Sequence, residues 1–284
     1  MQTLNQIKYL RAALNADKNH GGQVVLVPTM GNLHEGHLQL VRRAREVADI
    51  VVVSIFVNPM QFGASEDLSS YPRTLTEDQD KLDAENVDYL FIPDVPEIYP
   101  NGVDNHTTVA NPSLSNMLCG IHRPGHFQGV CTIVNKLFNL VQPSVAIFGE
   151  KDFQQLAIIK RMSSDLCMPI DIIGVPTARA HDGLALSSRN QYLNNIDRVK
   201  APIIYQTLQK TRDAIAAGSK QYGTLCESAK LDLKAAGFEV DYFDIRNQKN
   251  LTLLNNNDSD TDIVILAAAT LGETRLLDNI QISI

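Results

Sequence analysis

The sequence predicts an α/β protein in which a doubly wound parallel sheet is followed by a smaller α+β domain. Short apolar runs alternate with segments of helical periodicity through residues 1–176, the order expected of parallel strands joined by crossover helices. The run Ile50–Val57 is apolar on both faces, as strands covered by helices on both sides are. After Asn190 this order changes, so we predict a first domain at residues 1–176 and a second at 177–284.

The strands of the first domain are its short apolar runs, several of which are ended by a proline. They are predicted at Gln23–Val27, Ile50–Val57, Tyr89–Ile92, Val145–Phe148 and Ile170–Val175. The helix after the first of these strands is indicated by apolar residues that recur at helical spacing, namely Leu38, Val41, Ala44 and Ala48. Two further helices are predicted at Gly129–Val141 and Asp152–Leu166.

The second domain places helices before strands, which is typical of α+β units. Its helices are predicted at Asp197–Ala217 and Gly223–Ala236. Its strands are predicted at Phe238–Ile245, Asp262–Ala269 and Leu277–Ile284.

Length, charge and composition restrict the class of protein. The chain has 284 residues, 44% of them hydrophobic, which excludes wholesale disorder and fibrous proteins. Its 25 Lys and Arg against 32 Asp and Glu give a net charge of −7, which argues against nucleic acid as a partner. We find no apolar run of membrane-spanning length and no signal peptide, so we expect a cytoplasmic protein that binds no membrane.

The cysteines indicate a reducing compartment. Cys119, Cys131, Cys167 and Cys226 are scattered and form no C-x-x-C pair. We therefore expect buried free thiols rather than a disulfide framework or a zinc site.

The segments that follow the predicted strands are the candidate ligand-binding segments, because ligands of doubly wound sheets bind at the carboxyl ends of the strands. These segments also have the least generic compositions of the chain. They are Pro28–His37, Asn58–Gly63, Gly149–Asp152 and Pro176–Arg189.

The most informative of them is Pro28–His37, where a strand leads into a glycine turn and then a helix start. Backbone N–H groups and the helix dipole make such a start an anion site. His34 and His37 lie three residues apart, so both imidazoles can donate to one phosphate chain. Gly31 and Gly36 allow the backbone to approach a nucleotide closely. The alternatives are a structural histidine pair or a metal site, for which no third ligand lies at a telling spacing.

Three further segments carry groups that suit anions. In the turn Gly149–Asp152, Lys151 offers a point charge for a polyphosphate and the aspartate offers a helix cap. The hydroxyls and guanidinium of Ser187–Arg189 suit a phosphate clamp. The loop Arg123–Phe127 brings an arginine and a histidine that could close over an anion. Taken alone, the first two are better explained as a charged turn and a solvated loop, and the third is as well explained as a surface loop.

Two amides, Gln61 and Gln155, lie beside the same predicted strand ends. Amides recognise hydroxyl and carboxylate groups without adding charge, although both would also be ordinary as surface glutamines.

The spacing of these motifs resembles known enzymes. His34-x-Gly36-His37 and the later Ser187–Arg189 segment resemble the H-I-G-H and K-M-S-K-S signatures of the class I adenylyl-transferring superfamily. More closely, VPTMGNLHEGH, FVNPMQF, YPRT, RPGHF, FGEKDFQQL and DGLALSSRN together resemble the pantoate–β-alanine ligase (pantothenate synthetase) family. Ser188-Arg189 stands where many synthetases of the superfamily carry Lys-Ser, and the pantothenate branch shares this departure.

The resemblance implies a fold and a reaction. The fold would be a Rossmann-like domain for ATP and pantoate with a smaller C-terminal lid domain. The reaction would be the condensation of (R)-pantoate with β-alanine to pantothenate, AMP and pyrophosphate, through a pantoyl adenylate. Mg²⁺ would accompany ATP, and the protein would be a homodimer formed through its N-terminal domain.

The resemblance also implies roles for residues. The groups expected to cancel charge on the phosphates are His34, His37, Lys151 and Arg189. The ATP site would comprise Met30, Gly31, Asn32, Leu33, His34, Glu35, Gly36, His37, Gly149, Glu150, Lys151, Asp152, Ala178, Leu186, Ser187, Ser188 and Arg189. The site for pantoate and β-alanine would comprise Gln61, Gln155, Asn58, Tyr71, Arg123 and His126. No residue is assigned as a metal ligand. As a hypothesis, Pro176–Asn190 would be the hinge of the lid.

Other functions make different demands on the sequence. A nucleotidyltransferase of the same superfamily would need a cationic pocket for a phosphorylated acceptor, whereas Gln61 and Gln155 suit a hydroxyl with one carboxylate. An aminoacyl-tRNA synthetase would need a tRNA-binding module, which neither the net charge of −7 nor the remaining length provides. A non-catalytic interaction module would not gather phosphate-facing groups at strand ends.

Overall fold

The chain forms two compact units in a computed structural model, which describes residues 1–63, 66–256, 258 and 261–283. The first unit comprises Met1–Glu150 and Ile158–Pro176, and the second comprises Lys151–Ala157 and Thr177–Ile284. These units differ from the predicted division at residue 176 because residues 151–157 group with the second unit.

The first unit is built on a six-stranded sheet in the order β1-β4-β3-β2-β5-β6, with every neighbouring pair parallel. Its strands are β1 (Gln2–Leu4), β2 (Val24–Thr29), β3 (Ile50–Ile55), β4 (Tyr89–Phe91), β5 (Val145–Gly149) and β6 (Asp171–Val175). All of β3 is buried, which explains why its sequence is apolar at every position except Ser54. The chain proceeds from β2 toward β4 on one side and from β5 to β6 on the other. The predicted doubly wound α/β class is therefore confirmed.

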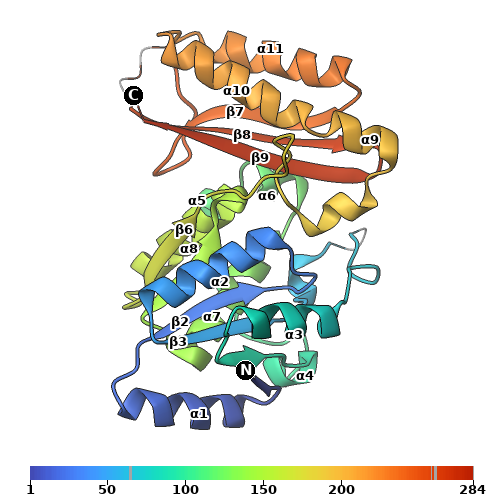
Figure 1. Ribbon diagram of the computed structural model, residues 1–284. Helices are drawn as coiled ribbons and strands as arrows, with labels where there is room; N and C mark the ends of the chain where they lie inside the picture. The colour runs from blue at the N-terminus through green and yellow to red at the C-terminus, as the bar shows by residue number, and fades with distance from the viewer. Residues whose placement is uncertain (64–65, 257, 259–260, 284) are drawn as a thin grey trace. The chain divides into compact units, whose positions relative to one another are not determined.

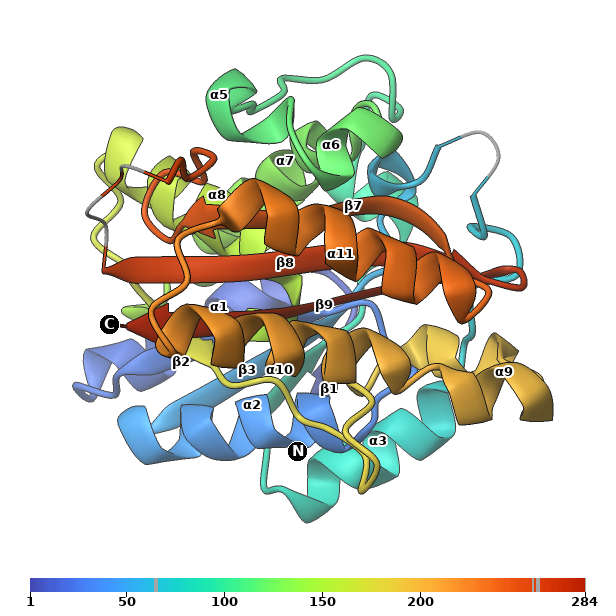
Figure 2. The same cartoon turned by 90° about the horizontal axis from the view of Figure 1, so that it is seen from above.

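Helices cover both faces of this sheet, as right-handed crossovers require. Figures 1 and 2 show α2 (Glu35–Val47) and α3 (Leu75–Ala84) on one face and α7 (His126–Val141) and α8 (Phe153–Asp165) on the other. The buried stripe of α2 is Leu40, Val41 and Ala44, at the spacing that the sequence indicated. The remaining helices of the unit are α1 (Ile7–Asn19), α4 (Val95–Ile98), α5 (Pro112–Ser115) and α6 (Cys119–His122).

Several elements of the first unit were not predicted, and their sequences explain why. Strand β1 has only three residues, and α3 buries only Asp78 and Leu82, so neither carries an apolar periodicity. Helix α7 begins at His126, three residues before its predicted start, because Gly125 at φ +82° provides the left-handed residue that precedes it.

The second unit is a three-stranded antiparallel sheet in the order β7-β8-β9 with two helices on one face, as Figure 1 shows. Figure 2 looks down on these helices, which lie side by side above the strands. The strands are β7 (Glu239–Asn247), β8 (Asp262–Leu271) and β9 (Thr274–Ser283), and the helices are α10 (Ile203–Ala216) and α11 (Tyr222–Ala235). Phe243, Ile265 and Leu233 lie in the core between them.

Two boundaries of the second unit differ from the prediction. The helix predicted at Asp197–Ala217 is two helices, α9 (Asn195–Lys200) and α10, because Pro202 interrupts the run. Strand β9 begins at Thr274 rather than Leu277, and the predicted last residue of that strand, Ile284, lies outside the described residues.

The cysteines are all free thiols, as predicted. Cys119 and Cys131 are buried and Cys226 is half-buried, but the prediction of burial is wrong for Cys167, which is exposed. Burial raises the pKa of the Cys131 and Cys226 thiols to about 11, so both are protonated and unreactive at neutral pH. Among the described residues, we find no helix with the length and apolar character needed to cross a membrane.

Candidate active site

The predicted ligand-binding segments of the first unit lie along one edge of its sheet. Parallel pairing places Thr29 beside Ile55 at the ends of β2 and β3, and β5 is the other neighbour of β2. Met30–His37, the 3₁₀ turn η1 (Pro59–Gln61) and Gly149 follow the carboxyl ends of these strands. From β2 the chain adds strands toward one edge of the sheet, and from β5 it adds them toward the other edge. The boundary between β2 and β5 is therefore the topological switch point, where ligands of such sheets bind.

The turn after β2 is held by a buried aspartate of α3. Asp78 is 1% exposed, and its carboxylate accepts the backbone N–H groups of Asn32 at 2.8 Å and Leu33 at 2.7 Å. Gly31 and Asn32 have φ of +82° and +50°, so the chain turns through the left-handed region here. A Cβ at Gly31 would lie 3.2 Å from the Asp78 Oδ2, which makes this position tight as well as left-handed.

These contacts bear on which groups of the turn could bind an anion. The N–H groups of Asn32, Leu33 and Gly36 already have acceptors within the protein, so side chains rather than these backbone groups are available to an anion. Leu33 is 3% exposed and packs in the core, and its carbonyl accepts the Lys81 ammonium at 2.7 Å. Leu33 therefore has a structural role in the core.

Glu35 also has a structural partner. It is exposed at the first turn of α2, where its carboxylate pairs with Arg42 of the same helix. This ion pair directs the Glu35 side chain along the helix surface.

The geometry of His34 and His37 fixes which ring nitrogen carries the proton. The Nδ1 of His34 accepts the Gly36 N–H at 3.1 Å, and the Nδ1 of His37 accepts the His34 N–H at 3.3 Å. Because both Nδ1 atoms are acceptors, the hydrogen of each neutral imidazole lies on Nε2. The ring centroids are 4.1 Å apart, as the spacing of three residues predicted. This reciprocal capping of α2 presents the pair as two Nε2–H donors.

Around η1, Asn58 orients the predicted substrate amide Gln61. The Asn58 Nδ2 donates to the Gln61 Oε1 at 3.1 Å and to the Gly129 carbonyl at 3.1 Å. Its Oδ1 accepts the Tyr99 hydroxyl at 2.8 Å. Asn58 is completely buried and orients the side-chain amide of Gln61 from within the fold. Since the Gln61 Oε1 is an acceptor here, its NH₂ group is the end left to face a substrate.

Gly129 allows α7 to approach η1 closely. A Cβ built at this position would lie 2.3 Å from the Met60 carbonyl oxygen, which is closer than atoms can pack. Any larger residue would therefore displace the turn that carries Gln61.

Arg123 and His126 meet Gln61 through its main chain. The Arg123 Nη2 donates to the Gln61 carbonyl at 3.1 Å, and the His126 Nδ1 donates to the same oxygen at 2.8 Å. The Arg123 Nη1 lies 3.0 Å from the His126 Nε2. Arginine has only donors, so the His126 Nε2 is the acceptor and its proton lies on Nδ1.

A glutamate that sequence reasoning missed completes this cluster. Glu66 accepts the Arg123 Nε at 2.9 Å and also pairs with Nη2. Burial raises the pKa of Glu66, but the hydrogen bond and charge of Arg123 outweigh it and hold the pKa below its usual value. The carboxylate is therefore ionised and balances the guanidinium charge, which leaves the cluster close to neutral. Tyr71, also predicted here, is 5% exposed and packs edge-on against Phe62.

The other predicted ATP residues lie in the second unit, on a short hairpin and the turn after it. Leu186 donates its N–H to the Ala178 carbonyl at 2.9 Å, and Arg179 pairs with Ala185 in an antiparallel bridge. Ser187 then begins the 3₁₀ turn η3 (Ser188–Tyr192), and its hydroxyl accepts the Arg189 N–H at 3.3 Å. The structure thus brings Ala178, Leu186 and Ser187–Arg189 together on one loop.

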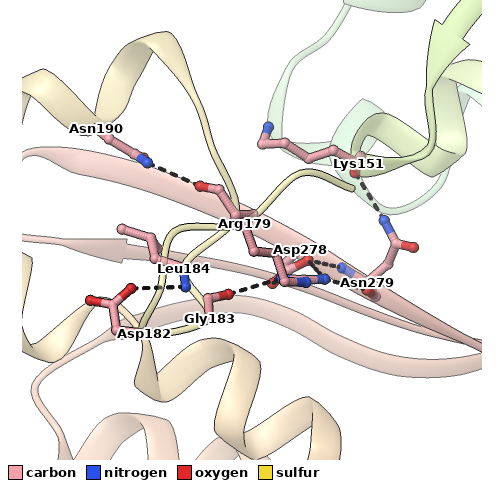
Figure 3. Close-up of polar contacts among 9 residues, drawn as sticks. Lys151, Arg179, Asp182, Gly183, Leu184, Asn190, Asp278 and Asn279 are labelled. Carbon is pink, nitrogen blue, oxygen red and sulfur yellow. Dashed lines mark hydrogen bonds and ion pairs between the residues drawn. The ribbon is translucent and has the colours of Figure 1, made fainter. Parts of the chain in front are cut away.

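Lys151, Asp152 and Gln155 also belong to the second unit. The Lys151 ammonium lies 3.8 Å from the Asp152 carboxylate and is 19% exposed. Figure 3 shows its side chain running away from Asn279, whose amide donates to the Lys151 carbonyl at 2.9 Å. Asp152 is exposed and Gln155 half-buried. Among the described residues, no group of three or more His, Cys, Asp or Glu side chains is placed to hold a metal ion.

Comparison with known proteins identifies close relatives over the whole chain. The family model described as pantoate-beta-alanine ligase matches residues 2–281. The pantothenate synthetases of Pseudomonas savastanoi pv. phaseolicola and Marinobacter nauticus are 54% and 52% identical, and the alignments cover 100% of this chain and 99% and 100% of those proteins.

Solved structures agree with the sequence relatives. The pantothenate synthetase of Thermus thermophilus has a TM-score of 0.92 at 44% identity, over 99% of both chains. The pantoate-beta-alanine ligase of Francisella tularensis, whose structure is a complex with beta-gamma ATP and beta-alanine, has a TM-score of 0.82 at 34% identity, over 99% of this chain and 97% of that one.

Proposed function

The chain belongs to the pantoate-beta-alanine ligase family, and we propose that it condenses pantoate with β-alanine through a pantoyl adenylate made from ATP. The observation that carries this proposal is the cluster at the carboxyl edge of the first unit's sheet. There a pair of Nε2–H imidazole donors follows β2, and an oriented amide, Gln61, follows β3. Such a pair suits phosphates, and such an amide suits a hydroxyl with one carboxylate.

The first step needs positioning more than acid–base chemistry. A carboxylate is already ionised at neutral pH, so pantoate attacks the α-phosphate of ATP without a base, and pyrophosphate leaves. The protein stabilises the charge that develops on the phosphates, and one such donor is typically worth about 3–4 kcal/mol of barrier. We assign this work to His34 and His37 in the first unit and to Lys151 and Arg189 in the second.

The hydrogen bonds of the histidines limit them to donation. Each Nδ1 already accepts a backbone N–H, so neither ring takes up a further proton without losing its place in the helix cap. His126 is limited in another way, because its Nε2 accepts from Arg123. We therefore infer that none of these imidazoles is the base that deprotonates β-alanine, and that the amine binds after losing its proton.

The substrate site is assigned to the groups around η1. We propose that the NH₂ group of Gln61, held by Asn58, donates to pantoate, and that β-alanine binds next to it. Gln155 is assigned to pantoate as well. The near neutrality of the Arg123–Glu66 pair suits a substrate whose carboxylate must react rather than be held in an ion pair.

Mg²⁺ enters this proposal as part of the substrate. Magnesium usually binds through phosphates and water with few protein ligands, so it would arrive with ATP. A homodimer, a cytoplasmic location and a lid role for residues 177–284 also belong to the proposal, and sedimentation analysis tests the first of these.

Exchange of labelled pyrophosphate into ATP tests the proposed reaction. The wild-type protein should catalyse exchange only when pantoate is present. His37→Ala should lower the rate by about 10²–10³-fold while the protein stays folded. His37→Asn restores a short side-chain acceptor for the helix cap but lacks Nε2, so it should be equally slow. Normal exchange in either variant, or pantoate-independent exchange in the wild type, would contradict the assignment.

A further inference from the structure

A buried ion pair in the second unit connects segments that carry predicted ATP-binding residues. The Arg179 guanidinium binds the Asp278 carboxylate through both of its Nη atoms, at 2.6 and 2.9 Å. Asp278 lies in β9 and its side chain is 0% exposed, while that of Arg179 is 18% exposed. Figure 3 shows the Arg179 side chain directed toward Asp278, with Gly183 beside it.

Each group of the pair also holds the main chain of a neighbouring segment. The Arg179 Nη1 donates to the Gly183 carbonyl at 3.2 Å, which closes the hairpin turn. The Asp278 carboxylate accepts the Asn279 N–H at 2.7 Å. Asn279 in turn donates its side-chain amide to the Lys151 carbonyl at 2.9 Å. One connected set of contacts therefore links the hairpin, β9 and Lys151.

The surroundings of Arg179 leave it little freedom. Its guanidinium stacks on the Tyr205 ring at 3.6 Å from the ring centre. Gly183 adopts φ +93°, and a Cβ there would lie 2.7 Å from the same ring. Two positions of the hairpin, Arg179 and Gly183, are thus held against Tyr205.

Stability alone does not explain such a pair. The removal of two charges from water costs so much that well-packed apolar residues in place of a buried ion pair are often at least as stable. A bidentate pair, however, sets both distance and orientation, which an apolar contact does not. The contacts of this pair lead to Ala178 and Leu186 on one side and to Lys151 on the other.

We propose that Arg179, Asp278 and Asn279 form a positioning network that sets the geometry of Lys151 and of the 178–189 loop for adenylate formation. This inference rests on the proposed function, because it concerns the ATP groups of that reaction. None of the three side chains needs to touch substrate. They act by holding the groups that do.

A pair of double variants separates positioning from stability. Arg179→Met with Asp278→Leu replaces the network's ion pair by apolar side chains. The control, Arg275→Met with Asp241→Leu, makes the same change at a half-buried pair that joins β9 to β7, where Arg275 Nε lies 2.7 Å from the carboxylate. Both are compared with the wild type in pantoate-dependent pyrophosphate exchange, with thermal midpoints measured in parallel.

We expect the first double variant to keep its thermal midpoint near that of the control and to raise the KM for ATP at least tenfold. The KM for pantoate should change less than the KM for ATP, because Gln61 and its partners lie in the other unit and Asn279 contacts the main chain of Lys151 rather than Gln155. A merely structural loss would reduce kcat through a smaller folded fraction and leave both KM values unchanged. A KM for ATP within twofold of the wild-type value would overturn the proposal.

Asn279→Ala provides a second measurement, which decides the matter if the double variant does not fold. It removes the hydrogen bond to the Lys151 carbonyl and should raise the KM for ATP three- to tenfold, whereas an unchanged KM would refute the network's role at Lys151. A wild-type protein without pantoate-dependent exchange would instead contradict the proposed function itself, so the two failures are distinguishable.

Discussion

Replacement of Asp78 by Asn should loosen the turn that carries the histidine pair. The carboxylate accepts two backbone N–H groups, those of Asn32 and Leu33, at a site where it is 1% exposed. An amide of the same shape keeps one acceptor oxygen and turns an NH₂ group toward the second N–H. One charge-assisted hydrogen bond is thereby lost, which is worth about 1.5–3 kcal/mol.

Hydrogen exchange measures this loss where it occurs. At about 1.4 kcal/mol per factor of ten, the amide hydrogens of Asn32 and Leu33 should exchange about 10- to 100-fold faster in Asp78→Asn than in the wild type. The KM for ATP should rise as well, because the turn leads directly into His34. Asp80→Asn is the matched control, since it makes the same change at another position of the same helix, where the side chain is exposed. Equal exchange at residues 32 and 33 in the two variants would refute the anchoring role of Asp78.

Two further predictions concern the substrate cluster. The Glu66 pKa is held below its usual 4.5, so the stability that its carboxylate contributes is present above about pH 4.5 and is lost as the pH falls through the folded value. The thermal midpoint of Glu66→Gln should therefore lie below that of the wild type at pH 7 and approach it as the pH falls further below 4.5, and a gap independent of pH would count against the Arg123 pairing. Gly129→Ala should raise the KM for pantoate and lower the midpoint, because its Cβ would lie 2.3 Å from the Met60 carbonyl oxygen. Gly223→Ala is the control, because no atom lies within 4 Å of a Cβ at that position, and it should change neither the KM for pantoate nor the thermal midpoint. If Gly129→Ala and Gly223→Ala gave the same values, the close approach of α7 to η1 would not be required.

The central strands could be predicted because burial on both faces makes their own sequences apolar, whatever residues they pack against. Val24–Val27 and Ile50–Ile55 are almost wholly inaccessible, and Ser54 is the one polar residue in the two runs. Helix α3 could not be predicted in the same way, because its buried residues include a charged one, Asp78. Its place in the fold depends on a polar contact, which periodicity does not reveal.

The residues of the candidate site also differ in whether local sequence could predict their contacts. Local spacing predicted that His34 and His37 lie close together, and the rings are in contact. Asp78, Glu66 and Asp278 were missed because their partners lie 45, 57 and 99 positions away in the chain. An isolated acidic residue in a sequence carries no indication of which N–H group or guanidinium it will meet once folded.

Helix α8 has a consequence for the exchange of segments between relatives. Its residues through Ala157 group with the second unit, and those from Ile158 onward group with the first. The chain therefore contributes to the second unit in two separate pieces, and no single cut releases that unit whole. A chimaera joined only at residue 177 would combine the Asn279 amide of one parent with the Lys151 main chain of another. Recombination that respects the fold must take residues 151–157 and 177–284 from the same parent.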